Sequence, residues 1–411
     1  MKYARVKNIL RYIKRITYKH MLAVIVLVIL FYTAWVSFPQ TLFVTGAYLR
    51  DADKGDEKAS IREQLAKEYR EMLDFSGNVL NDKGTYINLN GLVARILGQR
   101  EVNERVKLNN GHLALIVDRP QGIATPTSML TALCDRQKAN GKYFLFVIAP
   151  SEIPKYEQIL PAGYVDYSNQ NADKLLDALR NNDVPVLDLR EELYNDNISY
   201  DEALCVTDHH WKPATGFWAY TKIIDHLKGA GIVGEIDPMY TDIGSYNVEV
   251  YKDWFLGSSG KRTGIYFAGV DDFAIITPKF GGDDMTVEIP SWSVYRKGFF
   301  VDIAYNMGAN RLDYFSGNPY MAYGHSDSDF MRYRNASAPI DLRIMSIGDS
   351  CTNIPCTFLP LVFSTCDELD MRHYQKNFEE YYAEYDPDVV IVLIGASSVN
   401  QPNTTYRFFS N

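Results

Sequence analysis

The sequence predicts an α/β domain with a mainly parallel sheet that is flanked by helices. Three mainly apolar runs, 142–149, 342–347 and 388–394, are typical of strands buried on both faces of such a sheet. A helical stretch near 171–182 separates the first run from a shorter strand at 183–189, which gives the order strand, helix, strand. Ligands bind beyond the carboxyl ends of strands in open α/β sheets, so the turns after these runs are candidate sites.

The chain begins with a basic segment and continues as an acidic body. Residues 1–20 carry seven Lys and Arg and no acid; the remaining residues carry 35 bases against 51 acids, a net charge of −16. Phosphate binding requires clustered Lys and Arg, so the body is a poor general binder of nucleic acid. We therefore expect no nucleic-acid partner.

Residues 21–38 contain no charge, and the next charged side chain is Arg50. Eighteen apolar residues suffice for a membrane span, and the preceding bases place the N-terminus in the cytoplasm. A cleaved signal peptide is the alternative; the long basic lead and the lack of a clear small-x-small site favour an uncleaved anchor. We expect a cytoplasmic tail (1–20), a single-pass anchor (21–38), a stalk (39–79) and an extracytoplasmic domain (80–411) at the cell membrane.

The remaining segments are predicted in order. Residues 51–73 have helical spacing, 85–91 resemble a strand that ends in a turn, and Asn110-Gly111 is a hairpin dipeptide. Residues 125–140 and 214–227 are helical, and 368–372 form a short strand. Residues 232–335 are rich in Gly, Asp and Tyr with little helix, which indicates an inserted β-rich lobe.

Tyrosine and cysteine contents are compatible with several functions. The 29 tyrosines serve packing or stack on sugar rings. The five cysteines are odd in number and too sparse for a disulfide scaffold, so we expect small packing residues, with one disulfide left open. They are Cys134, Cys205, Cys351, Cys356 and Cys366.

The stretch Asp208-His209-His210-Trp211 holds two of the chain's seven histidines. An imidazole can take the proton of a hydroxyl nucleophile, and a nearby carboxylate fixes its tautomer, so Asp208 and His210 are candidate catalytic groups. His209 then points the other way, and Trp211 buries and holds the loop. The alternative is a capped turn before a helix that begins near Pro213.

Gly348-Asp349-Ser350 follows a predicted strand directly. The glycine permits a sharp turn, and Ser350 is the candidate nucleophile; the alternative is a simple helix N-cap. Asp208, His209 and His210 also match in composition the metal ligands of DHH phosphoesterases, but those enzymes use further ligand motifs that this chain lacks. We therefore predict no metal.

The combination of Asp208-His209-His210-Trp211 with Gly348-Asp349-Ser350 resembles the bacterial DHHW protein family, which is similar to SGNH-like acetyltransferases of alginate biosynthesis. Further segments agree over about residues 80–400, namely 149–154, 160–161, 186–190, 350–353 and 370–374. The order Asp-His before Ser matches the alginate-type enzymes and is reversed in ordinary SGNH hydrolases. The resemblance implies an SGNH-hydrolase-like sheet.

The resemblance also implies a triad of Ser350, His210 and Asp208. It implies an oxyanion site at the backbone N–H of Ser350 with Asn353 or Tyr374, and an Arg372 that orients substrate or supports its loop. Cys351 stands where an aromatic residue is expected in many relatives, which puts the local packing in doubt.

The resulting expectation is a membrane-anchored O-acyltransferase, and specifically an O-acetyltransferase, that modifies a cell-surface polysaccharide through an acyl-enzyme. The resemblance implies a multi-span membrane acyltransferase partner. No nucleotide-binding loop is visible, so we expect no cofactor and no acyl-CoA site. The alternatives are a carbohydrate acetylesterase, or a non-catalytic glycan-binding or assembly protein in which Ser350, His210 and Asp208 lie apart.

Overall fold

The computed structural model describes Phe31 and residues 83–282, 284–324, 328–399 and 406–408. The chain divides into two units, Met1–Tyr86 and Ile87–Asn411, and the fold described below is that of the second. The predicted basic tail, membrane anchor and stalk lie outside the described residues, apart from Phe31. Among the described residues, no helix combines the length and the apolar character needed to cross a membrane.

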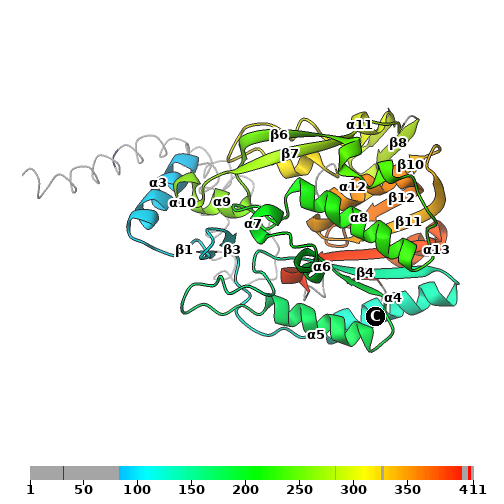
Figure 1. Cartoon of the computed structure of the whole chain (residues 1–411), viewed down its shortest axis with the longest axis horizontal. Coiled ribbons are helices and arrows are strands. Elements are labelled where there is room, and N and C mark those ends of the chain that lie inside the picture. The colour runs from blue at the N-terminus through cyan, green and yellow to red at the C-terminus, as the bar shows by residue number, and fades with distance from the viewer. Residues whose placement is uncertain (1–30, 32–82, 283, 325–327, 400–405, 409–411) are drawn as a thin grey trace, which may run out of the picture. The chain divides into compact units, whose positions relative to one another are not determined.

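The domain is organised around an eight-stranded sheet in the order β5-β4-β13-β11-β12-β10-β8-β9 (Figure 1). The first five strands are parallel, and β10, β8 and β9 add antiparallel pairings at one side. Their bounds are β5 Val186–Asp188, β4 Tyr143–Ala149, β13 Val389–Gly395, β11 Ile340–Gly348, β12 Phe363–Leu369, β10 Phe330–Asn335, β8 Met285–Ile289 and β9 Val294–Gly298. The predicted strands at 142–149, 183–189, 342–347 and 388–394 are therefore confirmed.

Helices cover both faces of the parallel part, as its apolar strands require (Figure 1). Successive residues of β4 alternate between two cores: Leu145 and Val147 join one, and Phe144 and Phe146 join the other. The first core is packed by α6 (Leu189–Asn195), α7 (Tyr200–Ala203), α8 (Pro213–Gly229) and α12 (Asn353–Val362). The second is packed by α4 (Ala124–Ala139), α5 (Ser168–Arg180) and α13 (Phe378–Tyr385).

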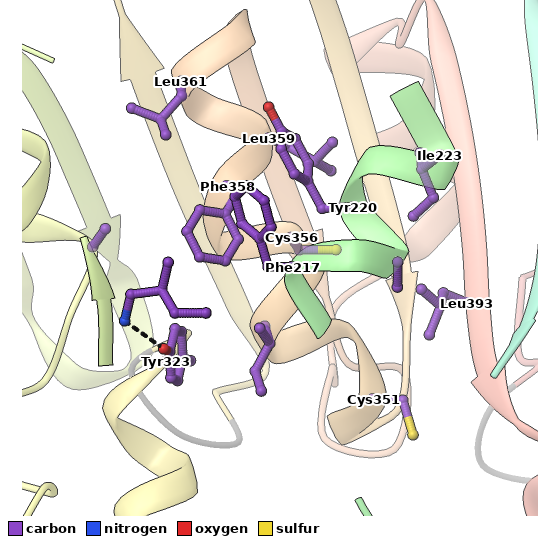
Figure 2. Close-up of a cluster of buried hydrophobic side chains, with 14 of the residues drawn as sticks. Phe217, Tyr220, Ile223, Tyr323, Cys351, Cys356, Phe358, Leu359, Leu361 and Leu393 are labelled. Atoms are coloured by element: carbon purple, nitrogen blue, oxygen red, sulfur yellow. Dashed lines mark hydrogen bonds between the residues drawn. The ribbon is translucent and has the colours of Figure 1, made fainter. Parts of the chain in front are cut away.

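Aromatic side chains join α8 to α12 in the first core (Figure 2). Phe217 of α8 meets Phe358 of α12 edge to face, with ring centroids 5.0 Å apart, and Tyr220 lies 5.6 Å from the same ring. Since α8 follows the Asp208–Trp211 stretch and α12 follows Ser350, this packing fixes the two segments that carry the predicted catalytic groups.

Residues 232–335 are β-rich as predicted, but they are not a separate inserted lobe. Strands β8, β9 and β10 belong to the main sheet; β6 (Tyr246–Phe255) and β7 (Asp271–Pro278) form a two-stranded sheet of their own. In β8 and β10 buried and partly exposed side chains alternate over most of the strand, so these antiparallel strands lack the long apolar runs that mark the parallel ones. Short helices α9 (Ser258–Thr263), α10 (Ile265–Ala268) and α11 (Phe300–Ile303) complete the region.

Two expectations near the start of the domain have opposite outcomes. The Asn110-Gly111 hairpin is confirmed, because it joins β2 (Arg105–Lys107) to β3 (Leu113–Ala114) in a small sheet with β1 (Glu101–Val102). The strand expected at 85–91 is wrong: these residues belong to α3 (Lys83–Ile96). Gly91 lets α3 pack directly on α9, since a Cβ there would approach the Thr263 carbonyl oxygen to 2.2 Å.

Candidate active site

The Asp208–Trp211 stretch lies on a loop that is fixed at both ends. Leu204 and Trp211 form an isolated antiparallel bridge, the Lys212 N–H donates to the Ala203 carbonyl at 2.8 Å, and α8 then begins at Pro213 as predicted. The indole of Trp211 is buried, so the predicted holding role of this residue agrees with its position. His209 does not point the other way as expected: its side chain is 44% exposed and its Nδ1 lies 3.1 Å from Ser258 Oγ, but its ring packs on the His210 ring with centroids 3.8 Å apart.

The structure brings together the three predicted triad residues. His210 Nε2 lies 2.7 Å from Ser350 Oγ, and His210 Nδ1 lies 2.5 Å from Asp208 Oδ1. Segments 140 residues apart in the sequence thus form a continuous relay from carboxylate to imidazole to hydroxyl. This is the arrangement in which a serine can transfer its proton to a histidine whose tautomer is fixed by an acid.

Asp208 remains ionised in spite of its burial. Burial alone would raise the pKa of this carboxyl, but the two adjacent imidazoles and hydrogen bonds from His210 and from the Ser258 N–H hold the pKa well below its usual range. The stability that this depressed pKa contributes is present above the ordinary carboxyl range and is lost as the pH falls through the folded-state pKa. An ionised Asp208 can therefore stabilise the positive charge that His210 acquires when it takes the proton of Ser350.

Ser350 is presented by a sharp turn after β11. A Cβ at Gly348 would meet the Leu393 carbonyl oxygen at 2.0 Å, so only glycine lets β11 end this close to β13. The carboxylate of Asp349 accepts hydrogen bonds from the N–H groups of Cys351 (2.9 Å) and Gly395 (3.0 Å). Gly348 and Asp349 thus shape the turn, and Ser350 begins the short helix η6 (Ser350–Thr352) at its end.

Tyr320 is a site residue that the sequence did not indicate. Its ring stacks on the His210 imidazole with centroids 4.0 Å apart and planes 16° apart, and its hydroxyl donates to the Ser350 carbonyl at 3.1 Å. Tyr320 is buried, so one rigid side chain fixes both the base and the backbone of the nucleophile. It lies in the region expected to be a separate lobe, where no motif marks it.

Residues 232–335 also supply groups that hold Asp208 and the loop before it in place. The Ser258 N–H donates to Asp208 Oδ2 at 2.5 Å, and Asp271 accepts hydrogen bonds from the N–H and hydroxyl of Thr207 at 2.8 and 2.6 Å. A Cβ at Gly257 would approach the Cβ of Asp208 to 2.2 Å, so glycine is required for this contact. Sequence reasoning missed these residues because they act through backbone groups and a buried carboxylate that carry no motif.

Asn353, predicted for the oxyanion site, lies one turn after Ser350 at the start of α12. It is buried, and within the described part of the chain its Nδ2 has no hydrogen-bond partner. Ser350 is the first residue of η6, so its own N–H has no acceptor within that helix. Two donors close in the sequence to the nucleophile thus remain compatible with the predicted oxyanion site.

Arg372 and Tyr374 do not join the triad. The Arg372 guanidinium donates to both carboxylate oxygens of Asp370, with Nε–Oδ1 at 2.9 Å and Nη2–Oδ2 at 2.6 Å, which fits its predicted role of supporting the loop. Tyr374 packs in the second core, 6.3 Å from the ring of Phe330, and burial raises its pKa to about 12. The expectation that Tyr374 lines an oxyanion site is not supported by this position.

Asp208, His209 and His210 also satisfy the spacing of a metal site, with ligand atoms within 4.8 Å of one another. Those atoms are engaged elsewhere: the Asp208 oxygens bond His210 and the Ser258 N–H, and His210 Nε2 faces Ser350. A metal ion would have to displace these bonds. The donor set therefore fits a proton relay better than a metal centre.

All five cysteines are buried and free, so the packing interpretation is confirmed and the disulfide left open is absent. Cys351 follows Ser350 directly, and burial raises the pKa of its thiol. It is therefore a protonated packing residue at the position where an aromatic side chain was expected.

Glu152 is a second buried acid near the site, in the loop after β4. Burial raises its pKa to about 7. Below about pH 4.5 this carboxyl is protonated in both the folded and unfolded states; between there and pH 7 only the unfolded state loses the proton, so stability falls as the pH rises.

We expect Glu152→Gln to remove this pH dependence. The wild-type protein should lose up to about 3 kcal/mol between pH 4.5 and 7 through this group, whereas the variant should lose little. Thermal unfolding of both proteins at pH 5 and pH 8 measures the difference, with Glu157→Gln, an exposed neighbour, as the matched control. Equal pH slopes in wild type and Glu152→Gln would contradict the assignment.

Comparisons with known proteins identify solved structures of similar fold. No protein-family model matches the chain, and no curated protein matches it significantly. The fold is similar to the solved structure of Bacillus cereus PatB1 with a sulfonyl adduct, at 18% identity and a TM-score of 0.63 over 76% of this chain and 100% of that chain. A DHHW family protein from Eubacterium siraeum matches at 14% identity and a TM-score of 0.55 over 74% and 95%.

The O-acetyltransferase domain of Pseudomonas putida AlgJ is a looser match, with 10% identity and a TM-score of 0.44 over 72% of this chain and 92% of that chain. The solved structures that resemble this chain thus include a DHHW family protein, as the sequence motifs led us to expect. At these identities the likeness concerns the fold.

Proposed function

We propose that this protein is an SGNH-like O-acyltransferase that works through an acyl-enzyme on Ser350. The observation that carries the proposal is the relay itself, in which Ser350 Oγ lies 2.7 Å from a His210 ring nitrogen whose other nitrogen lies 2.5 Å from Asp208. The non-catalytic alternative required these residues to lie apart. Their contact favours acyl-transfer chemistry.

In the proposed first step, Ser350 Oγ attacks the carbonyl carbon of an acyl donor while its proton passes to His210 Nε2. The C–O bond to the donor then breaks, and the leaving oxygen takes that proton. In the second step an acceptor hydroxyl gives its proton to His210 and attacks the acyl carbon, and Ser350 recovers a proton from His210 as it leaves. Asp208 stabilises the imidazolium in both steps. Each donor to the developing oxyanion contributes about 3–4 kcal/mol.

The acyl group we propose is acetyl, and the acceptor is a hydroxyl of a cell-surface polysaccharide. The proposal rests on the motif resemblance and on the acidic domain that follows the apolar segment 21–38. That segment would anchor the chain in the cell membrane, with the catalytic domain outside, where a multi-span membrane acyltransferase would supply the acyl group. An acetylesterase would use the same groups, with water in place of the sugar hydroxyl.

The nucleophile is tested by covalent labelling. Sulfonyl reagents form adducts with activated hydroxyls; the structure of PatB1 that resembles this fold contains a sulfonyl adduct. The full-length protein in mild detergent is treated with phenylmethylsulfonyl fluoride or an aryl acetate, and the modified peptide is identified by mass spectrometry. We expect the adduct on Ser350, and its loss in Ser350→Ala.

Ser397→Ala is the matched control, because Ser397 follows the neighbouring strand β13 at the same edge of the sheet. This variant should label as the wild type does. Labelling at a different residue, or no labelling of protein that retains its near-ultraviolet circular dichroism, would refute Ser350 as the nucleophile.

A further inference from the structure

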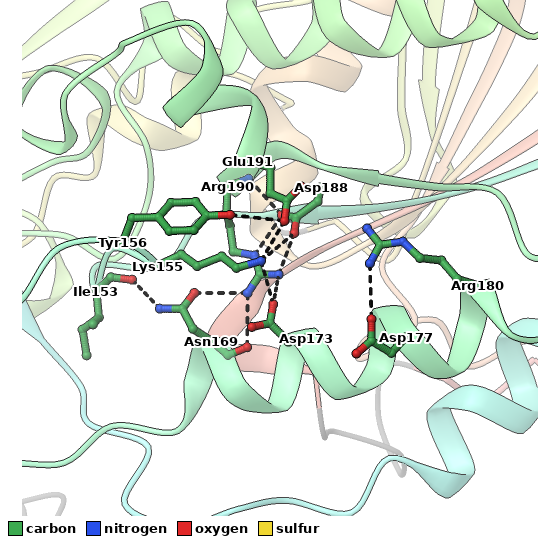
Figure 3. Close-up of polar contacts among 10 residues, drawn as sticks. All are labelled: Ile153, Lys155, Tyr156, Asn169, Asp173, Asp177, Arg180, Asp188, Arg190 and Glu191. Atoms are coloured by element: carbon green, nitrogen blue, oxygen red, sulfur yellow. Dashed lines mark hydrogen bonds and ion pairs between the residues drawn. The ribbon is translucent and has the colours of Figure 1, made fainter.

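A cleft of about 430 Å³ opens between the loop after β4, residues 154–157, and the segment that joins α6 to α7. Figure 3 shows the polar network beneath one of its walls. The cleft lies outside the triad and takes no part in the proton relay. We call it the tyrosine cleft, after three of its lining residues, Tyr156, Tyr194 and Tyr200.

Two of these tyrosines form an aromatic wall that faces solvent. The side chains of Tyr156 and Tyr194 are 51% and 64% exposed, and their ring centroids lie 4.6 Å apart with planes at 46°. Ring faces of this kind stack on the apolar faces of sugars, while the phenol hydroxyls bond to sugar hydroxyls at the edges.

The third tyrosine offers an unused donor. Tyr200 is 8% exposed, and its hydroxyl oxygen faces the backbone N–H of Lys155, but its own O–H has no acceptor among the residues described. Buried polar groups are nearly always paired, so this O–H suits an acceptor on a ligand or a water in the tyrosine cleft. Asn195 and Asn197 line the same cleft and supply amide groups that both donate and accept.

The walls are fixed by a charge network (Figure 3). Lys155 Nζ lies 2.9 Å from Glu191 and 3.0 Å from Asp173, and Arg190 pairs at 2.7 Å with both Asp173 and Asp188. Both cations are thus neutralised by three carboxylates. The tyrosine cleft therefore offers a rigid surface that is slightly negative, and a polyanionic ligand would be repelled from it.

The tyrosine cleft lies on the same edge of the sheet as the nucleophile. Strands β11, β13, β4 and β5 are parallel neighbours, so the ends of β4 and β5 lie about 10 and 14 Å from the end of β11 at a spacing of about 4.8 Å per strand. The tyrosine cleft and the catalytic loop are also close in the chain. Helix α7 begins at Tyr200, which lines the cleft, and the carbonyl of Ala203 at its end accepts a hydrogen bond from the N–H of Lys212, two residues after His210. A polymer bound in the tyrosine cleft could reach the triad.

We propose that the tyrosine cleft binds an uncharged stretch of a carbohydrate chain and positions a neighbouring hydroxyl for acylation at Ser350. The positioning of a hydroxyl for acylation rests on the proposed function, whereas the binding of the glycan does not require catalysis. It assigns the class of acceptor: a neutral glycan, whose rings stack on Tyr156 and Tyr194, rather than a polyuronate.

The test measures binding on the full-length Ser350→Ala variant, which cannot form the acyl-enzyme. Isothermal titration is performed in a zwitterionic detergent, because glucoside and maltoside head groups are themselves sugars. The probes are cellotetraose, the N-acetylglucosamine tetramer and tetragalacturonate. We expect at least one neutral tetrasaccharide to bind, Tyr194→Ala and Tyr156→Ala each to weaken that binding about tenfold, and tetragalacturonate not to bind.

Tyr295→Ala is the matched control, because Tyr295 is an equally exposed tyrosine on the distant edge strand β9, and its loss should leave binding unchanged. The proposal is overturned if no neutral tetrasaccharide binds, if the two cleft substitutions leave affinity unaltered, or if tetragalacturonate binds as tightly. Sulfonyl labelling of Ser350 is scored separately. Binding without labelling would therefore refute only the acyl-transfer proposal, and labelling without binding would refute only the tyrosine cleft.

Discussion

Replacing His210 by glutamine is expected to slow acylation of Ser350 by at least about 10⁴-fold. His210 Nε2 lies 2.7 Å from Ser350 Oγ. Glutamine can hydrogen-bond the hydroxyl but cannot take its proton at neutral pH, so the serine would remain a weak nucleophile. Stopped-flow measurement of aryl acetate acylation gives the rate.

His209→Gln is the comparison for this result. His209 is adjacent in sequence, but its side chain is 44% exposed and points to Ser258 rather than to Ser350. We expect its loss to be far smaller than that of His210→Gln. Equal losses in the two variants would show that the chemistry depends on the stretch as a whole and would remove His210 as the specific base.

Asp208→Asn is expected to reduce acyl transfer by about 10⁴-fold with little change of shape. Both oxygens of Asp208 act as acceptors: Oδ1 for His210 Nδ1 and the His210 N–H, and Oδ2 for the Ser258 N–H. An asparagine has only one acceptor, so in either orientation its NH₂ group faces a donor. If the NH₂ group faces Nδ1, the imidazole takes the tautomer that presents N–H, not a lone pair, to the serine.

The turnover number with an aryl acetate measures this effect, and nitrogen-15 NMR of the histidines reports the tautomer. Asp272→Asn is a suitable control, because Asp272 is a partly exposed carboxylate that pairs with Lys252 at the surface. A variant Asp208→Asn that retains both the tautomer and most of the activity would show that the carboxylate does not orient His210.

Most of the parallel part of the fold could be predicted because its longest strands carry their own signal; the exception is β12, which was expected at 368–372 and spans Phe363–Leu369. Strands β4 and β13 are buried on both faces almost throughout, so their sequences are continuous apolar runs that need no tertiary information. Strand β11 is buried over its second half, where its sequence is mainly apolar. The antiparallel strands could not be found in this way, since alternating polar residues in β8 and β10 also suit loops. Helix α3 was mistaken for a strand because β-branched and aromatic residues dominate at 85–87.

The residues of the candidate site could likewise be predicted only where a local sequence motif marks them. Asp208, His210 and Ser350 could be predicted because each stands in a short motif whose chemistry is local. Tyr320 and Asp271 could not, because stacking on His210 and capping of the Thr207 N–H arise only when distant segments meet. Tyr374 was assigned to the oxyanion site from the family resemblance of segment 370–374, and its place in the second core does not support that role.

The buried thiols have a consequence for how the folded domain behaves towards its surroundings. A fold with five free cysteines and no disulfide has no covalent cross-link to be formed during maturation or broken by a reductant. Because a protonated, enclosed sulfur is a poor nucleophile, Cys351 reacts only when the chain around Ser350 opens. The rate at which thiol reagents modify Cys351 therefore measures how often the segment next to the nucleophile opens.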